Sequence, residues 1–164
     1  MKFSLVHELP RDADTAWSLL MSDAYEAAVG QGSTMQRVTI ESRVEAGVLH
    51  ARSRITSDKE LPGPIAKVVG AKALSYELVE RSDAKSRTSQ WEVIPSKLAD
   101  RVTAKGTYVI EPGPTPDTCV RKIDGEVIVK VAIVGKKIED IIGQEIRASY
   151  EKSTDFAREY LRTH

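Results

Sequence analysis

The chain opens with an alternation of apolar and polar side chains. One face of residues 2–9 carries Phe3, Leu5, His7 and Leu9. A period of two residues is typical of a half-buried β-strand. Pro10 ends the pattern, since proline has no N–H to donate to a neighbouring strand. We therefore predict a strand over residues 2–9.

Two short helices are predicted next. Asp12 or Asp14 can cap a helix that runs to about Met21, because an aspartate side chain accepts hydrogen bonds from the free N–H groups at a helix start. Ser22 can cap a second helix that runs to about Val29.

The region from Thr34 to Val134 is rich in Val and Ile and is divided by turn residues at short intervals. Six strands are predicted, over residues 34–45, 48–58, 72–81, 86–96, 101–111 and 117–134. Consecutive strands with short links favour an antiparallel sheet.

A helical pattern replaces the strand pattern after Gly135 and continues over about 136–162. At 1.5 Å per residue this helix is roughly 40 Å long. A sheet with one apolar face and a single helix to cover it curls around that helix. The predicted fold is therefore α+β, a curved seven-stranded antiparallel sheet wrapped around a long C-terminal helix, in one domain over residues 1–164.

Three stretches carry a resemblance to a known superfamily. They are the opening MKFSLVHELPRDADTAWSLL, the WEVIP of Trp91 to Pro95, and GEVIVKVAIVGKKIEDII from Gly125 to Ile142. With the order of elements, they resemble the helix-grip fold of the START-like (SRPBCC) superfamily, which includes lipid-transfer domains, pollen allergens and polyketide aromatase/cyclases. The chain is most similar to an uncharacterised bacterial family of unknown function within it. The resemblance implies a fold and a hydrophobic cavity, and it carries no catalytic residue.

The C-terminal helix has an apolar face that polar residues interrupt. Within about 40° of one direction on a helical wheel lie Ile138, Ile142, Phe156 and Tyr160. The same stripe contains Glu145, Ser149 and Ser153. Burying a carboxylate against the sheet would cost several kcal/mol without a partner. These residues therefore line a hydrated or ligand-filled hollow, or else the helix is turned so that Glu145 reaches solvent.

The last strand is predicted to form the opposite wall of that hollow, with Val127, Val129 and Val131 facing inward. The spacing of strand and helix sets Glu145 opposite about Val129. Arg121 has the same inward parity but lies near the proline-rich turn. We expect it on the rim in solvent, with an anchor for a ligand carboxylate as the alternative.

Other polar or aromatic residues also fall on predicted inner faces. His7 is either an ordinary core histidine or, if it bonds to Glu145, an oriented base with a raised pKa. Tyr76, Trp91 and Tyr108 are candidate wall residues, and core packing is the alternative for each.

The segment from Leu61 to Gly70 is too apolar for a solvated loop, and its prolines and glycines suggest a hinge. We predict a short helical segment over the cavity mouth. Its apolar contacts would be Ile65, Val68 and Val69, and it would gate the uptake of a ligand or simply cap the fold.

Composition limits the partners. Lys+Arg and Asp+Glu are both 24, which gives no electrostatic case for nucleic acid. The single cysteine, Cys119, excludes an internal disulfide and fits a reducing cytoplasm. Three histidines are too few to indicate a histidine-rich metal site. We expect no metal and no cofactor, no signal peptide, no membrane-spanning segment and no nucleotide-binding or hydrolase motif. The oligomeric state stays open between monomer and dimer.

These features predict non-catalytic binding, transport or sequestration of a hydrophobic or amphipathic small molecule or lipid between sheet and C-terminal helix. A hydroxyl or amine end is preferred beside Glu145 over a free carboxylate. One alternative is a cavity enzyme of the aromatase/cyclase or hydrolase type, with Glu145 or His7 as acid or base. The other is a protein-interaction domain with a closed groove.

Overall fold

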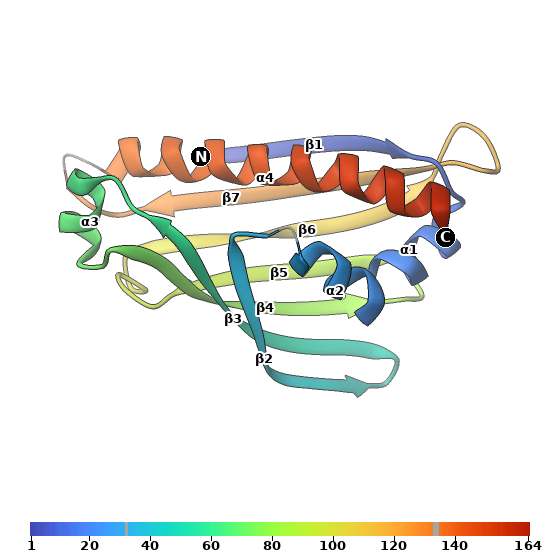
Figure 1. Ribbon diagram of the computed structural model, residues 1–164, viewed down its shortest axis with the longest axis horizontal. Helices are drawn as coiled ribbons and strands as arrows, with labels where there is room; N and C mark the ends of the chain where they lie inside the picture. The colour runs from blue at the N-terminus through green and yellow to red at the C-terminus, as the bar shows by residue number, and fades with distance from the viewer. Residues whose placement is uncertain (32, 133–134) are drawn as a thin grey trace.

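The protein is described by a computed structural model that covers residues 1–31, 33–132 and 135–164. Its elements follow the predicted order (Figure 1). They are β1 (Lys2–Leu9), α1 (Ala13–Leu20), α2 (Asp23–Gln31), β2 (Met35–Glu45), β3 (Val48–Glu60), α3 (Gly63–Val69), β4 (Ala73–Asp83), β5 (Thr88–Pro95), β6 (Val102–Pro112), β7 (Cys119–Val129) and α4 (Gly135–Thr163).

The seven strands form one antiparallel sheet in the order β1-β7-β6-β5-β4-β3-β2. Its two edges, β1 and β2, do not pair with each other, so the sheet is open. The predicted fold class is confirmed. The last strand ends at Val129 and not at residue 134, and residues 133–134 lie outside the described part of the chain.

Local sequence explains where these elements begin and end. In β1 the odd residues are buried and the even residues exposed, as the alternation predicted. Asp12 caps α1 by accepting a hydrogen bond from the Thr15 N–H at 3.0 Å. Gly70 ends α3 in the left-handed conformation, with φ of 72°, which a residue without Cβ adopts freely.

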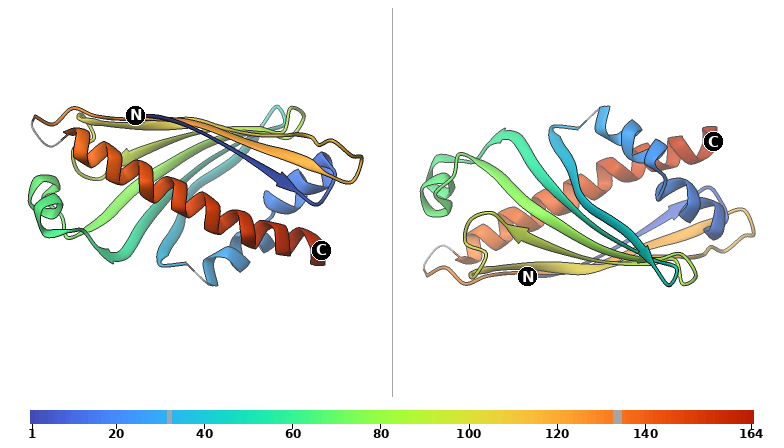
Figure 2. Two further views of the ribbon diagram at one scale, coloured as in Figure 1. Left: turned by 90° about the horizontal axis from the view of Figure 1, so that it is seen from above. Right: turned by 90° about the horizontal axis from the view of Figure 1, so that it is seen from below.

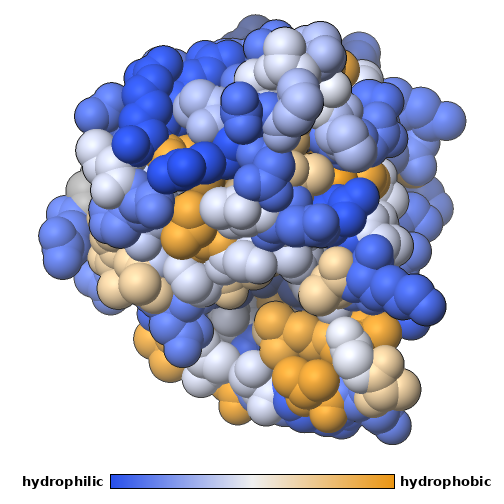
Figure 3. Space-filling model, turned by 90° about the vertical axis from the view of Figure 1, so that its right-hand side faces the viewer, coloured by the Kyte–Doolittle hydropathy of each residue, from blue (hydrophilic) through white to orange (hydrophobic). Residues whose placement is uncertain are grey.

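The sheet curves, and α4 runs along its concave side (Figure 2). The helix packs mainly on β7 and β1, while α1 and α2 lie at its carboxyl end and α3 lies at the opposite end of the molecule (Figure 1). The hairpin of β2 and β3 extends away from α4. Figure 3 views the molecule from the end that carries α1 and shows an apolar patch in the lower part, at the height of this hairpin. Val38, Ile40 and Val44, on the β2 strand of the hairpin, are exposed.

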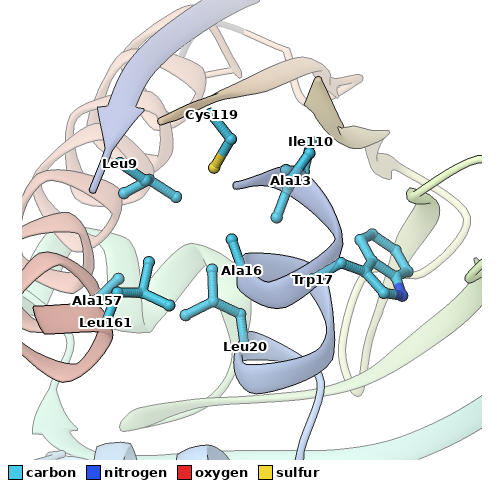
Figure 4. Close-up of a cluster of buried hydrophobic side chains, with 9 residues drawn as sticks. All are labelled: Leu9, Ala13, Ala16, Trp17, Leu20, Ile110, Cys119, Ala157 and Leu161. Carbon is cyan, nitrogen blue, oxygen red and sulfur yellow. The ribbon is translucent and has the colours of Figure 1, made fainter. Parts of the chain in front are cut away.

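Two apolar clusters fill the space beneath α4. The first surrounds α1 (Figure 4) and consists of Leu9, Ala13, Ala16, Trp17, Leu20, Ile110, Cys119, Ala157 and Leu161. The second lies under the amino-terminal half of α4 and consists of Phe3, Leu5, Ala104, Ile123, Val127, Val129 and Ile138. At about 25 cal/mol per Å² of apolar surface removed from water, these clusters supply the main favourable contribution to folding.

The buried face of α4 differs from the predicted one. Its buried residues are Gly135, Ile138, Gly143, Thr154, Ala157 and Leu161. At 3.6 residues per turn, the mean direction of these buried residues around the helix axis lies roughly 80° from the apolar stripe predicted from the sequence. Small residues such as Gly143 and Ala157 let the helix approach the strands closely. The bulky Phe156 is instead 39% exposed and contacts Tyr25 of α2, with ring centroids 5.8 Å apart.

Candidate functional site

A layer of polar side chains separates the two apolar clusters. His7 of β1, Arg121 of β7 and Thr154 of α4 are 6%, 3% and 0% exposed. Along β1, His7 stands between Leu9 of the first cluster and Leu5 of the second, and in the sheet His7 and Arg121 are directly paired. The register of the strands therefore places these polar groups at one level of the interior.

Arg121 lies at the centre of this layer. Its Nη2 donates to the Oγ1 of Thr154 and approaches the Nδ1 of His7 at 3.3 Å. Its Nε is buried and has no hydrogen-bond partner in the described residues. The prediction of a rim position was wrong, because α1, the end of β1 and the carboxyl end of α4 cover the start of β7.

His7 links this interior to the surface. A guanidinium has no acceptor, so the Nδ1 of His7 accepts from Arg121, and the proton of neutral His7 is on Nε2. Nε2 lies 3.5 Å from the Oε1 of Glu151, which is 66% exposed. Burial lowers the pKa of His7, the charge on Arg121 lowers it further, and Glu151 partly opposes both effects. Neutral His7 is therefore the favoured form.

The charge of the guanidinium acts on three tyrosines, of which Tyr108 is in contact with it. The Arg121 Cζ lies 5.8 Å from the ring centroid of Tyr108, which packs against both apolar clusters. Burial raises the pKa of Tyr150 to about 12, and it also raises the pKa of Tyr25 and of Tyr108; the charge on Arg121 opposes each rise. The three hydroxyls therefore stay protonated at neutral pH and can donate hydrogen bonds.

The register confirms that Tyr76, Trp91 and Tyr108 point to the concave side. Trp91 pairs with Gly106, while Tyr76 pairs with the buried Ile55 of β3. Because Gly106 has no side chain, the indole lies over it, and a Cβ there would come within 2.5 Å of the Trp91 Cζ2. The indole Nε1 is buried and has no hydrogen-bond partner in the described part of the chain.

An ion-pair network ties α2 to the same side of the sheet. Arg37 of β2 contacts Glu26 of α2 at 2.8 Å and Glu80 of β4 at 2.7 Å. Its Nε also donates to the Oγ of the buried Ser53 at 3.2 Å. No residue of α2 is buried, so these contacts and the Tyr25 ring hold the helix in place.

The predicted polar residues of α4 occupy the flank of the helix. Glu145 and Ser149 are exposed, and Ser153 is half-buried, with its hydroxyl donating to the Tyr150 carbonyl at 3.0 Å. The hydrogen bond suggested between His7 and Glu145 is not formed; His7 faces Glu151 instead. The rotation of α4 about its axis explains both results, and it matches the alternative prediction in which Glu145 reaches solvent.

The predicted wall of β7 is covered by the helix. Val127 and Val129 are buried in the second cluster together with Ile138, and Ile142 and Val131 pack against that cluster. The hollow predicted between β7 and α4 is therefore filled by side chains. The concave side beyond it keeps half-buried residues on β4 and β5, among them Leu78 and Val93.

The segment predicted over the cavity mouth is the short helix α3. Ile65, Val68 and Val69 are half-buried, and Val68 packs against the second apolar cluster. This contact ties α3 to the cluster that lies under α4. The gating role assigned to these residues stays a prediction.

A hollow of about 580 Å³ lies on the opposite, convex face of the sheet. Its lining side chains are mostly outward-facing charged and polar residues of β4 to β7, including Arg81, Gln90, Lys105 and Asp124. It contains charges of both signs, and we place no site there.

The chemistry of the described residues is limited. They contain no group of three His, Cys, Asp or Glu side chains that could hold a metal ion. Burial raises the pKa of the Cys119 thiol to about 11, so this free cysteine is not an activated nucleophile. None of the described helices is long and apolar enough to cross a membrane.

Sequence reasoning missed Thr154, Tyr25, Tyr150 and the network of Arg37. A wheel centred on the small residues of the last helix would have placed Thr154 inside. The inward parity of His7 and Arg121 was visible, but their direct pairing depends on β1 lying next to β7, which local patterns do not specify.

Residues 4–161 match DUF2505, described as a protein family of unknown function. The chain belongs to the DUF2505 family. No protein of curated function matches this DUF2505 sequence.

Solved structures similar to this DUF2505 protein have the same helix-grip, START-like fold. The protein TTHA0849 from Thermus thermophilus is 13% identical, with a TM-score of 0.66 over 99% of this chain and 98% of its own. The Zhui aromatase/cyclase from a Streptomyces species is 12% identical, with a TM-score of 0.66 over 99% and 94%. Norcoclaurine synthase from Thalictrum flavum, in complex with dopamine and hydroxybenzaldehyde, is 18% identical, with a TM-score of 0.67 over 100% and 89%.

Proposed function

We propose that this DUF2505 protein binds an amphipathic small molecule on the concave side of its sheet, beside α4, without covalent chemistry. The observation that carries this proposal is the buried indole N–H of Trp91, which has no partner in the described residues. A buried donor that lacks an acceptor costs about 1–3 kcal/mol, and a ligand oxygen at this position would remove that cost.

The surroundings of Trp91 support this proposal. Tyr76, Leu78 and Val93 are half-buried on the same side and offer an apolar wall. Norcoclaurine synthase, with the same fold, was solved with two small aromatic molecules. From α4, we propose that Ile142, Ser149, Ser153 and Phe156 contact the ligand, with Glu145 at the mouth. We also propose that α3 gates uptake.

The absence of catalysis is proposed from the state of the reactive groups. Acid–base catalysis needs a polar group within hydrogen-bond reach of a reacting atom. In the described chain both nitrogens of His7 already face Arg121 and Glu151, and the Cys119 thiol is protonated and buried. We also infer that the protein acts in the cytoplasm, because a fold with a single cysteine does not rely on an internal disulfide.

Native mass spectrometry of the freshly purified protein tests binding. We expect a co-purifying small molecule as an added mass. A ligand at a hundred times its Kd stabilises the fold by about 2.7 kcal/mol, so a thermal-shift panel of lipids and aromatic compounds should raise the Tm by roughly 5–10 °C. No added mass and no shift across the panel would overturn the proposal.

A further inference from the structure

The charge of Arg121 has no counterion within the described chain. Its Nη2 donates to Thr154 Oγ1 and to His7 Nδ1, and both of these acceptors are uncharged. No carboxylate in residues 1–31, 33–132 and 135–164 forms an ion pair with it. The nearest acidic group in this chain of contacts is Glu151, which lies beyond the imidazole of His7.

A cation that is 3% exposed is normally paired, because removal from water is costly without a counter-charge. Here the guanidinium also keeps an Nε that has no partner in the described residues. The hydroxyls of Tyr25, Tyr108 and Tyr150, whose pKa values Arg121 influences, are uncharged, so they do not supply a counter-charge. The interior of the described chain therefore holds one positive charge without a counter-charge and, on the same guanidinium, one N–H without an acceptor.

We propose that the ligand is an anionic amphipath, whose oxyanion head binds Arg121 and whose apolar body lies along Tyr108 toward Trp91, where a second ligand oxygen accepts from the indole N–H. This inference rests on the proposed function and names its ligand class. A carboxylate or sulfonate supplies the missing charge and accepts hydrogen bonds from Nε and from the tyrosine hydroxyls.

This assignment takes up the role of carboxylate anchor that the sequence offered for Arg121 as the alternative to a rim position, and it replaces the preferred ligand head. A hydroxyl or amine head was preferred because Glu145 was placed inside the hollow. The structure puts Glu145 on the exposed flank of α4 and puts Arg121 inside. An ammonium group beside a buried guanidinium would be repelled, whereas an oxyanion would be attracted.

Two dyes of the same shape test the charge of the head. Anilinonaphthalene sulfonate and the neutral phenylnaphthylamine share one aromatic body and differ by the sulfonate. Hydrogen bonds to a charged group contribute about 1.5–3 kcal/mol, so the sulfonate dye should bind roughly 10- to 100-fold more tightly. Equal affinity of the two dyes would overturn the proposal.

Arg121→Gln tests the residue. We expect it to abolish the preference for the sulfonate while leaving the affinity for phenylnaphthylamine within about twofold, and we expect Arg121→Lys to restore part of the preference. Arg54→Gln is the matched control, since Arg54 is exposed and its partner is Glu77. A preference that survives Arg121→Gln, or that Arg54→Gln reduces equally, would contradict the assignment.

A wild-type experiment covers the case in which Arg121→Gln does not fold. Dodecanoate and dodecanol are each added as competitors of bound phenylnaphthylamine. We expect dodecanoate to displace the dye at a concentration about tenfold lower than dodecanol does. Equal displacement would overturn the anion assignment and leave the proposed function standing. Failure of both dyes and both competitors to bind would overturn the proposed function as well.

Discussion

Arg121 donates a hydrogen bond to Nδ1 of His7 across 3.3 Å, so a buried histidine serves as an uncharged acceptor for a buried cation. This arrangement holds only while His7 is neutral. A proton on Nδ1 would remove the acceptor and place two positive charges in contact.

The first prediction is a pH dependence of stability that comes from His7. Burial and Arg121 lower its folded pKa below the ordinary value of about 6.5. Well above pH 6.5, His7 is neutral in both the folded and the unfolded chain, and the unfolding free energy has its full value. As the pH falls from 6.5 to the folded pKa, the unfolded chain takes up a proton that the folded chain does not, so stability is lost.

Urea unfolding between pH 7.5 and 5.5 measures this loss. His7→Gln keeps a side-chain acceptor for Arg121 and removes the titration, so the difference in unfolding free energy between the two pH values should narrow. His50→Gln, on the outer side of β3, is the control and should leave the difference as in the wild type. An unchanged difference in His7→Gln would show that His7 has no such role.

Thr154 is predicted to stabilise the fold through its hydroxyl. Its Oγ1 accepts from Arg121 and donates to the Tyr150 carbonyl at 2.6 Å. Thr154→Val keeps the shape and loses both bonds, so we expect a loss of about 1–3 kcal/mol in unfolding free energy. Thr154→Ser should recover most of it. Thr163→Val, at an exposed threonine of the same helix, should change stability by less than about 0.5 kcal/mol.

A glycine is predicted to be required at position 106, because the Trp91 ring lies directly over it. A methyl group there would meet the Trp91 ring and the Asp124 carbonyl, so Gly106→Ala should cost about 1–3 kcal/mol and shift the tryptophan fluorescence. Gly30→Ala, in α2, has no atom within 4 Å of the added Cβ and should be neutral or slightly stabilising. Equal effects of the two substitutions would contradict the packing described for Trp91.

The rotation of α4 predicts that substitutions on its exposed side and on its buried side have different effects on the unfolding free energy. Glu145→Ala and Ser149→Ala change exposed positions and should alter the unfolding free energy by less than about 0.5 kcal/mol. Leu161→Ala removes a fully buried side chain and should cost about 2–5 kcal/mol.

The proposed place of Glu145 at the ligand mouth predicts that Glu145→Ala changes ligand affinity without this loss of stability. Titration with anilinonaphthalene sulfonate measures the affinity.

The gating role of α3 predicts a kinetic effect. Replacing Val68 and Val69 with Asp would detach the helix from the second apolar cluster, so stopped-flow mixing with anilinonaphthalene sulfonate should show faster uptake and release. Val38→Asp, at an exposed valine of β2, is the control. Rates that match the wild type in the double variant would leave α3 as a plain capping segment.

The sequence by itself determined the order of elements and the inward parity of most strands. Strand alternation and turn residues are local properties, which is why β1 and the inner positions of β7 were predicted correctly. The same parity correctly predicted that Tyr76, Trp91 and Tyr108 face the inner, concave side of the sheet.

Only the tertiary structure decided the rotation of α4 and the burial of Arg121. Hydrophobicity marks where a helix is apolar, but the small residues Gly143 and Ala157 decide which face fits closely against β1 and β7. That rotation moves Glu145 out and Thr154 in. Whether a charged residue near a turn is on the rim or inside depends on which distant elements cover it, and for Arg121 those are α1 and the end of α4.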